Sequence, residues 1–129
     1  MASGSMTQGP VGARRRAARL AIRVPGSLSG RSSRPITLVD VSLTGCLVRC
    51  GTLLDQGAIF DLRTELGGEA FVAKVRVTSA SLDGAPSEGD APCLAGLEFL
   101  SLPALEGARL RHFVEQERRR RRGADPATD

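Results

Sequence analysis

Two runs of alternating apolar and polar residues flank a Gly-Gly pair near the middle of the chain. The first run extends from Phe60 to Leu66 and the second from Phe71 to Val77, and Gly67 and Gly68 lie in the link between them. Alternation places one set of side chains on one face of a strand, and a short glycine-rich link favours a tight turn between two such strands. The sequence therefore predicts an antiparallel hairpin with one face turned to a core.

Four other segments have the composition and alternation of strands: Leu20–Val24, Ile36–Val39, Cys46–Cys50 and Leu94–Phe99. Turn-forming residues separate them, and Pro25 with Gly26 is expected to end or bulge the first. Together with the hairpin they make six short strands with half-polar faces, a pattern that favours an antiparallel sheet over a parallel one. We therefore expect a mainly β fold, an antiparallel barrel or sandwich.

A C-terminal α-helix is predicted after the last strand, with Pro103 in its first turn, where proline is tolerated. Its apolar stripe consists of Leu105, Leu110, Phe113 and Val114. The helix runs into five consecutive arginines, Arg118–Arg122, whose charge suits the negative end of a helix, and Gly123 ends it. A solvated helix end is the simpler interpretation of these arginines, and contact with an acidic partner or nucleic acid is the alternative.

Charge is distributed unevenly along the chain. Residues 1–34 contain seven arginines and no acidic residue, whereas residues 35–117 contain six basic and twelve acidic residues. Two basic flanks therefore border an acidic body. The small and polar residues 1–13 are expected to form a disordered N-terminal segment, residues 14–117 the globular domain, and residues 118–129 a basic helix end with a disordered tail.

The residues that carry most enzymatic chemistry are scarce. His112 is the only histidine, and the three cysteines, Cys46, Cys50 and Cys93, form no Cys-x-x-Cys pair. We therefore expect no enzyme, no metal, no cofactor and no disulfide framework, with His112 on the surface and Cys46 and Cys50 facing the core. No apolar run approaches the roughly 20 residues that span a bilayer, and no signal peptide is recognisable, so the expected location is cytoplasmic.

A short motif, Asp40-Val-Ser-Leu-Thr-Gly45, joins the second and third predicted strands. The period of a strand predicts that Asp40 and Ser42 point to the same face, and Gly45 lets the backbone turn or approach a ligand closely. A turn in which the Asp or Ser side chain bonds its own backbone is the alternative interpretation.

An Arg-x-x-x-Arg pair, Arg15 and Arg19, comes just before the first predicted strand. Arg19 and Arg23 have the same spacing, but Arg23 alternates within the strand, so we prefer the first pair. Over residues 14–116 the chain resembles the PilZ domain family, which combines an arginine arm of this form, an Asp/Asn-x-Ser-x-x-Gly motif and a six-stranded barrel with a C-terminal helix. The resemblance includes the closing strand Gly96–Phe99 and the helix with Leu110, Phe113 and Val114. It implies a six-stranded antiparallel β-barrel of split or Greek-key type with a C-terminal α-helix.

What the resemblance implies is binding of cyclic di-GMP, a bacterial second messenger with two guanines and two phosphates. Arg15 and Arg19 would grip guanine O6 and N7, or a phosphate, through paired N–H donors. Asp40 would accept hydrogen bonds from the guanine N1–H and N2–H₂ edge, Ser42 would add a hydroxyl, and Gly45 would leave room for the base.

The resemblance also suggests how such a receptor would act. In this family a basic residue before the arginine pair often accompanies a stacked pair of ligands, so Arg14 could grip a second molecule. Closure of the arm over the ligand would alter a surface of this stand-alone receptor and regulate motility, secretion, chemotaxis or polysaccharide machinery through a protein partner. Two alternatives remain: a PilZ-like interaction module without ligand, and a nucleic-acid-binding protein, which the acidic body and scarce aromatic residues disfavour.

Overall fold

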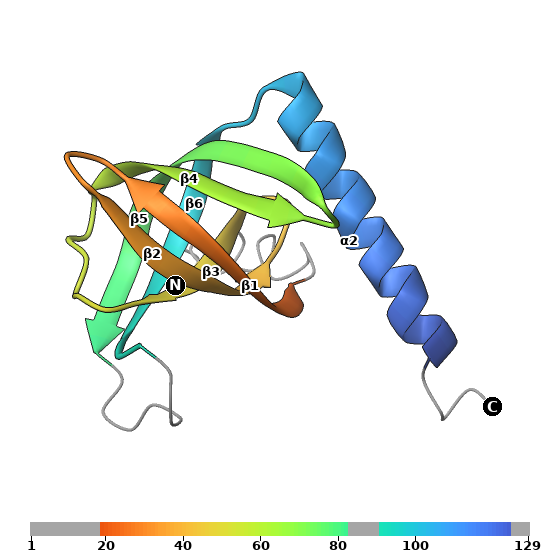
Figure 1. The fold of residues 1–129 in the computed structure, drawn as a ribbon, viewed down its shortest axis with the longest axis horizontal. Helices are drawn as coiled ribbons and strands as arrows, with labels where there is room; N and C mark the ends of the chain where they lie inside the picture. The colour runs from red at the N-terminus through yellow and green to blue at the C-terminus, as the bar shows by residue number, and fades with distance from the viewer. Residues whose placement is uncertain (1–18, 83–90, 125–129) are drawn as a thin grey trace, which may run out of the picture.

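The computed structural model describes residues 19–82 and 91–124. Within these ranges lie six β-strands and one α-helix: β1 (Leu20–Ser29), β2 (Ser33–Val41), β3 (Gly45–Cys50), β4 (Ile59–Leu66), β5 (Glu69–Leu82), β6 (Cys93–Ser101) and α2 (Ala104–Ala124). The predicted six-stranded antiparallel barrel with a C-terminal helix is confirmed (Figure 1). The predictions for residues 1–13 and 125–129, and for Arg14 and Arg15, fall outside the described residues.

The strands close into a barrel in the order β1-β2-β3-β6-β5-β4, and every neighbouring pair is antiparallel. Hairpin connections bring β1 next to β2, β2 next to β3 and β4 next to β5. The pairings of β1 with β4 and of β3 with β6 join strands that are distant in the sequence. The second of these pairings places the Asp40–Gly45 motif beside the end of β6, which positions the candidate site.

Each strand turns apolar positions inward, so the core is shared by the whole barrel. Fully buried residues of β1 to β6 are, in that order, Leu28, Leu38, Val48, Leu62, Val75 and Ala95. The helix α2 covers one end of the barrel and packs against β4 and β5 (Figure 1). Leu110, Phe113 and Val114 join the core from this helix, and burying side chains of this kind contributes roughly 1.5–3 kcal/mol each.

The predicted hairpin is confirmed as β4 and β5. Their pairing runs without interruption from Leu66 opposite Glu69 to Ile59 opposite Arg76. The turn requires glycine, because Gly67 and Gly68 have φ values of 62° and 85°, which side chains with a Cβ rarely adopt.

The first strand does not end at Pro25 and Gly26, and that prediction was wrong. β1 continues through both residues to Ser29, and its register shift with β2 lies upstream of Pro25. Gly26 is the first residue of β1 that pairs with β4, opposite Thr64, and a Cβ on it would lie 2.8 Å from the Arg63 carbonyl oxygen. The glycine therefore permits the close approach of β4 that closes the barrel, rather than a turn.

One residue of the predicted apolar stripe of α2 is also misplaced. Leu105 is 59% exposed, whereas Gly107 is buried with Leu110 and Val114. Because an α-helix has about 3.6 residues per turn, Gly107, Leu110 and Val114 share one side, and Leu105, five residues before Leu110, does not.

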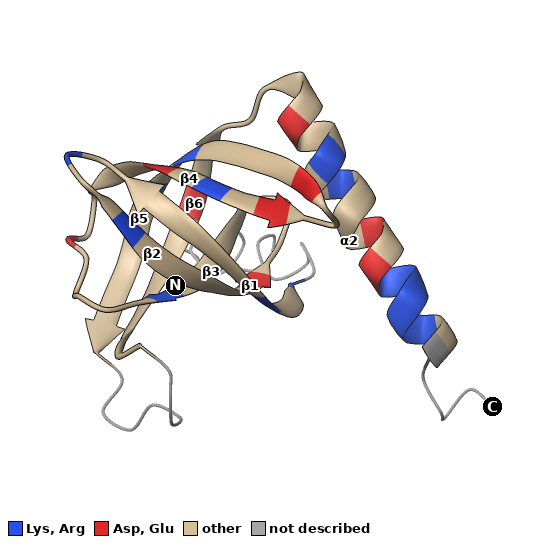
Figure 2. Ribbon diagram, viewed as in Figure 1, with Lys and Arg blue, Asp and Glu red and all other residues tan. Residues whose placement is uncertain are grey.

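The remaining helix and cysteine predictions agree with the structure. α2 runs through Arg118–Arg122 to Ala124, and Figure 2 shows this basic end continuing beyond the barrel. His112 is exposed, and the three cysteines are free and buried. Within the described part of the chain, no helix combines the length and apolarity needed to cross a bilayer.

Candidate functional site

The loop between β2 and β3 is a closed turn built around Ser42. The Ser42 side chain is fully buried, and its hydroxyl accepts a hydrogen bond from the Thr44 amide at 3.2 Å and lies 3.4 Å from the Gly45 carbonyl oxygen. The Ser42 amide donates to the same carbonyl at 2.8 Å, and the Phe99 amide of β6 donates to the Thr44 carbonyl at 2.9 Å. The Ser42 hydroxyl is thus used inside the turn, which holds Thr44 and Gly45 against β6.

A register shift in β2 lies just before Asp40. Ile36 and Leu38 point into the core, and strict alternation would turn Asp40 inward after them. The pairing with β3 shifts between Leu38 and Asp40, and Val41 becomes the next fully buried residue. Asp40 therefore reaches the outside of the barrel, and Ser42 follows Val41 into the buried turn.

Arg19 and Asp40 meet at the start of β1. The Arg19 Nε lies 3.1 Å from the Asp40 Oδ2, and the two side chains are 48% and 17% exposed. The second oxygen, Oδ1, is buried and makes no hydrogen bond to any described residue. This ion pair joins the arginine nearest the barrel to the acid of the loop motif, and it leaves one carboxylate acceptor unused.

A cavity of about 640 Å³ opens beside this pair, across the outer surface of β3, β6 and β5. Its volume lies in the range of about 300–1,000 Å³ that is common for small-molecule sites. The cavity is lined by Arg19, Thr44, Gly45, Cys46, Leu47, Thr78, Ser79, Gly96, Leu97, Glu98 and Phe99. Arg19 and Gly45 are therefore brought to one cavity, with Asp40 held at its edge by Arg19, while Ser42 lies in the turn behind it.

Two glycines of the cavity have different structural roles. A Cβ on Gly45 would lie 2.2 Å from the Leu97 carbonyl oxygen, so only glycine allows β3 and β6 to pair at this point. A Cβ on Gly96 would meet the Ser79 Oγ at 2.9 Å and the Thr78 Oγ1 at 3.1 Å, which are side-chain atoms. Gly45 therefore allows the pairing of β3 with β6 that closes the barrel, and Gly96 leaves the cavity free of a side chain beside Thr78 and Ser79.

The hydroxyls of Thr78 and Ser79 were missed by sequence analysis. Neighbours on a regular strand point to opposite faces, yet both residues are exposed, because the pairing of β5 with β6 shifts between Val77 and Ser79. Thr78 donates from Oγ1 to the Gly96 carbonyl oxygen at 3.1 Å. The glycine within the last strand was the available signal, because such glycines often mark a bulge or a close backbone approach.

The side chains of the cavity are mainly groups that form hydrogen bonds. Burial, with a further contribution from the Asp40 carboxylate, raises the pKa of the Cys46 thiol from 9.0 to about 12, so this lining residue stays protonated at neutral pH. Among the described residues no three His, Cys, Asp or Glu side chains group as metal ligands. The cavity offers a guanidinium, hydroxyls and the nearby carboxylate, together with the apolar Leu47 and Phe99.

Comparison with known proteins agrees with this architecture. A family model of the PilZ domain matches residues 13–116. No curated protein sequence matches the chain. Among solved structures, the PilZ domain with c-di-GMP of YcgR from Escherichia coli is similar, with a TM-score of 0.68 and 20% identity over 88% of this chain and 98% of that chain.

Two further structures have the same fold. The inhibitor of motility MotI/DgrA of Bacillus subtilis gives a TM-score of 0.61 and 15% identity over 77% of this chain and 48% of that one. The PilZ domain of CeSA from a cellulose-synthesizing bacterium gives a TM-score of 0.55 and 16% identity over 77% and 97% of the two chains. At these identities the structures show the shared barrel, and the family match covers most of the sequence. The chain therefore belongs to the PilZ domain family, a family of cyclic di-GMP receptors.

Proposed function

We propose that this PilZ domain binds cyclic di-GMP in the cavity over β3, β6 and β5, and that the bound form regulates a protein partner in trans. The observation that carries the proposal is the meeting of Arg19 and Asp40, 3.1 Å apart, at the edge of a cavity lined by Gly45. A cation and a carboxylate placed together can bond both the acceptor and the donor edges of a guanine.

Asp40 is proposed to read the guanine base. Its Oδ1 has no hydrogen-bond donor among the described residues, and a carboxylate accepts well from the N1–H and N2–H₂ groups that adenine lacks. Arg19 is 48% exposed, so it can swing from Asp40 toward the O6 and N7 edge or toward a phosphate. Each good paired contact to guanine is worth roughly 1–3 kcal/mol, a factor of about 5 to 150 in affinity.

The remaining cavity residues are proposed to shape the site around the nucleotide. Thr78 and Ser79 present hydroxyls beside Gly96, where a ribose hydroxyl could donate or accept and a phosphate oxygen could accept. Ser42 acts by closing the turn that holds Gly45, rather than through its own buried hydroxyl.

The arginine arm is proposed to close over the ligand. Arg15 lies four residues before Arg19 in the sequence, and Arg14 precedes it. Because Arg19 already stands at the cavity edge, further guanidinium groups just upstream can supply contacts to the phosphates, and Arg14 to a second nucleotide. Closure of this arm is the step that changes the surface presented to the protein partner.

Calorimetric titration tests the proposal. Cyclic di-GMP, GTP and cyclic di-AMP are titrated into the full chain, which gives affinity, selectivity and stoichiometry together. We expect binding of cyclic di-GMP alone, because GTP lacks the two bridging phosphates and cyclic di-AMP lacks the guanine edges, whereas cyclic di-GMP has both. Equal affinity for cyclic di-AMP would show that Asp40 does not select guanine. The absence of heat with saturating cyclic di-GMP would leave the Arg19–Asp40 ion pair as a purely structural contact.

A further inference from the structure

A second cavity lies between α2 and the β4–β5 hairpin and has a volume of about 330 Å³. We call it the helix groove. The apolar side chains of Leu66 and Phe113 lie at its base, and Ala108 and His112 of α2 are exposed along it. The groove is large enough for one aliphatic side chain of a partner, and nothing in the nucleotide site proposed above uses it.

The two ends of the helix groove differ in their available charge. At one end Arg109 is held by the hairpin: its Nε lies 3.1 Å from the Glu69 carboxylate, and its Nη1 donates to the Ala70 carbonyl oxygen at 2.7 Å. At the other end Glu117 holds Arg120 and Arg121, which follow it by one turn of helix. Because two guanidinium groups share one carboxylate, this end keeps a surplus of positive charge.

That positive end continues into the arginine run 118–122. The Arg120 and Arg121 side chains are 67% and 43% exposed, and Arg119 and Arg122 are also exposed. This part of α2 continues past the barrel (Figure 2), so the arginines are not needed to hold the helix in place. A cluster of guanidinium groups suits carboxylates, because each guanidinium can bond a carboxylate through two parallel N–H donors.

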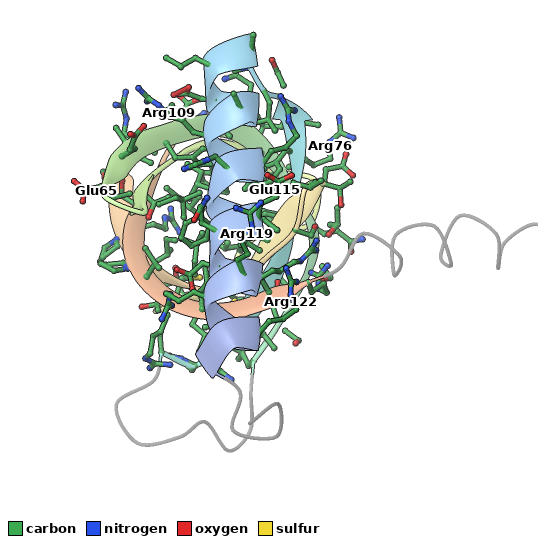
Figure 3. The ribbon with its side chains drawn as sticks, turned by 90° about the vertical axis from the view of Figure 1, so that its right-hand side faces the viewer. Glu65, Arg76, Arg109, Glu115, Arg119 and Arg122 are labelled. Atoms are coloured by element: carbon green, nitrogen blue, oxygen red, sulfur yellow. The ribbon has the colours of Figure 1, made fainter. Side chains whose placement is uncertain are left out.

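The helix groove and the nucleotide cavity lie on opposite sides of α2. Figure 3 shows Arg109 and Glu65 on one side of the helix and Arg76 on the other. Arg109 lines the helix groove, while Arg76 pairs at 3.4 Å with Glu98, which lines the nucleotide cavity. A molecule in the groove would therefore leave the nucleotide site open, and both can be occupied together.

We infer that the helix groove and Arg119–Arg122 dock an acidic segment of a protein partner that carries one aliphatic anchor residue. The anchor fills the groove between Leu66 and Phe113, and acidic residues next to it face the arginines. The inference deepens the proposed function, because a receptor that acts in trans needs a surface for its partner.

The surroundings of the groove favour a protein segment over nucleic acid. Glu65, Glu69 and Glu106 lie on or beside the hairpin and the first turns of α2, where a phosphate backbone following the helix would be repelled. A lipid surface also fits poorly, since the exposed arginines 119–122 are spread around the helix and leave it no apolar side to insert.

Fluorescence anisotropy with a defined probe tests the inference. The probe is a fluorescein-labelled peptide with one leucine at the end of a run of glutamates, and its counterpart has glutamate in place of the leucine. We expect the leucine peptide to bind the full chain and the all-glutamate peptide to bind more weakly by about fivefold or more, as one buried aliphatic side chain contributes. Equal affinity of the two peptides would overturn the role of the groove.

Matched variants locate the binding. Arg120→Gln with Arg121→Gln removes two charges from the run, and Ala108→Trp fills the groove. Each change is expected to lower the affinity for the leucine peptide by about tenfold. Arg31→Gln with Arg63→Gln removes the same charge from exposed positions of the barrel and is expected to have no effect. Unchanged affinity in the first two variants would overturn the inference, as would a duplex DNA that binds more tightly than the peptide and ignores Ala108→Trp.

The nucleotide titration keeps the two proposals apart. The Arg120→Gln, Arg121→Gln and Ala108→Trp variants should bind cyclic di-GMP as the unmodified chain does, since none of the three residues lines the nucleotide cavity. An Asp40→Ala chain should keep its affinity for the leucine peptide measured without nucleotide. Loss of peptide binding alone would contradict the docking surface, and loss of nucleotide binding alone would contradict the receptor proposal.

Discussion

At the scale of single residues, the proposed recognition depends on an ion pair that contributes little to the fold. Exposed ion pairs typically stabilise a protein by about 0–1 kcal/mol, and the Arg19 side chain is 48% exposed. The Asp40 Oδ1 makes no hydrogen bond to the described residues, so among these residues removing the carboxylate breaks the ion pair with Arg19 and no other hydrogen bond. Both side chains can therefore be changed without loss of the barrel.

Arg19→Ala and Asp40→Ala should each lower the affinity for cyclic di-GMP by at least about tenfold, the loss expected for one good contact to guanine. The melting temperature of each variant should stay within a few degrees of the unmodified chain. Calorimetry and thermal unfolding measure the two quantities on the same samples. Unchanged affinity in both variants would exclude this corner from ligand binding.

The two glycines of the cavity should respond differently to a methyl group. Gly45→Ala places a Cβ 2.2 Å from the Leu97 carbonyl oxygen, and the backbone must move, so we expect a loss of about 2–4 kcal/mol in unfolding free energy. Gly96→Ala meets only side-chain atoms of Thr78 and Ser79, so the fold should persist while nucleotide affinity falls.

Gly51→Ala is the control for both glycine variants, because a Cβ there would have no described atom within 4 Å. Urea unfolding and nucleotide titration of the three variants separate structural from ligand-shaping roles. A Gly45→Ala chain as stable as the Gly51→Ala chain would show that β3 and β6 do not require this close approach.

At the scale of elements, α2 is attached to the barrel by one narrow side. Leu110 is 1% exposed and Leu105 is 59% exposed, although both were predicted for the same stripe. Leu110→Ala should therefore lower the unfolding free energy by about 2–5 kcal/mol, whereas Leu105→Ala should change it by less than about 0.5 kcal/mol. Urea unfolding distinguishes the two, and equal effects would contradict the observed orientation of the helix.

The buried Cys46 thiol of β3 should make the folded state less stable at alkaline pH. The folded Cys46 thiol keeps its proton up to about 12, since burial raises its pKa, whereas an unfolded thiol begins to ionise near 9.0. Above that pH the unfolded state releases a proton that the folded state retains, so stability falls as pH rises. The loss from this thiol reaches about 2 kcal/mol at about pH 10.5.

Unfolding under reducing conditions at several alkaline pH values measures this loss. The Cys46→Ala chain is the control, and its stability should fall less steeply over the same range. Burial also raises the pKa of Cys50, to about 11, so part of the decline should remain in the control. Parallel curves for the two chains would contradict a strongly raised Cys46 pKa.

At the scale of the whole molecule, the elements that local patterns specify were predictable. The β4–β5 hairpin followed from alternation and from glycines whose φ values are positive. The extent of β1 did not, because Gly26 is required by its contact with β4, a strand far along the sequence. Local sequence cannot show which glycine serves a turn and which serves a close strand contact.

The candidate site was predictable in part for the same reason. Arg19, Asp40 and Gly45 do come together, but a register shift before Asp40 turns its side chain outward. Ser42 is buried because its hydroxyl bonds within its own turn. The Thr78 and Ser79 hydroxyls depend on another shift, between β5 and β6. Register shifts arise from pairing between strands, so period-two reasoning along one strand misses them.

The molecule as a whole is proposed to separate its two tasks by position. Nucleotide recognition lies over β3, β6 and β5, and partner docking lies across α2 beside the β4–β5 hairpin. Since α2 packs on β5, and β5 also supplies Thr78 and Ser79 to the cavity, one strand connects the two surfaces. Ligand occupancy can thereby influence the partner surface without overlap.

Backbone NMR of the full chain during titration with cyclic di-GMP tests the central claim most directly. The account predicts that the amide signals of Gly45, Ser79 and Gly96 shift first and saturate with the ligand, while that of Gly67 in the helix groove changes little. Saturation with no shift at Gly45, Ser79 or Gly96, or shifts confined to the helix groove, would contradict binding at the Arg19–Asp40 corner.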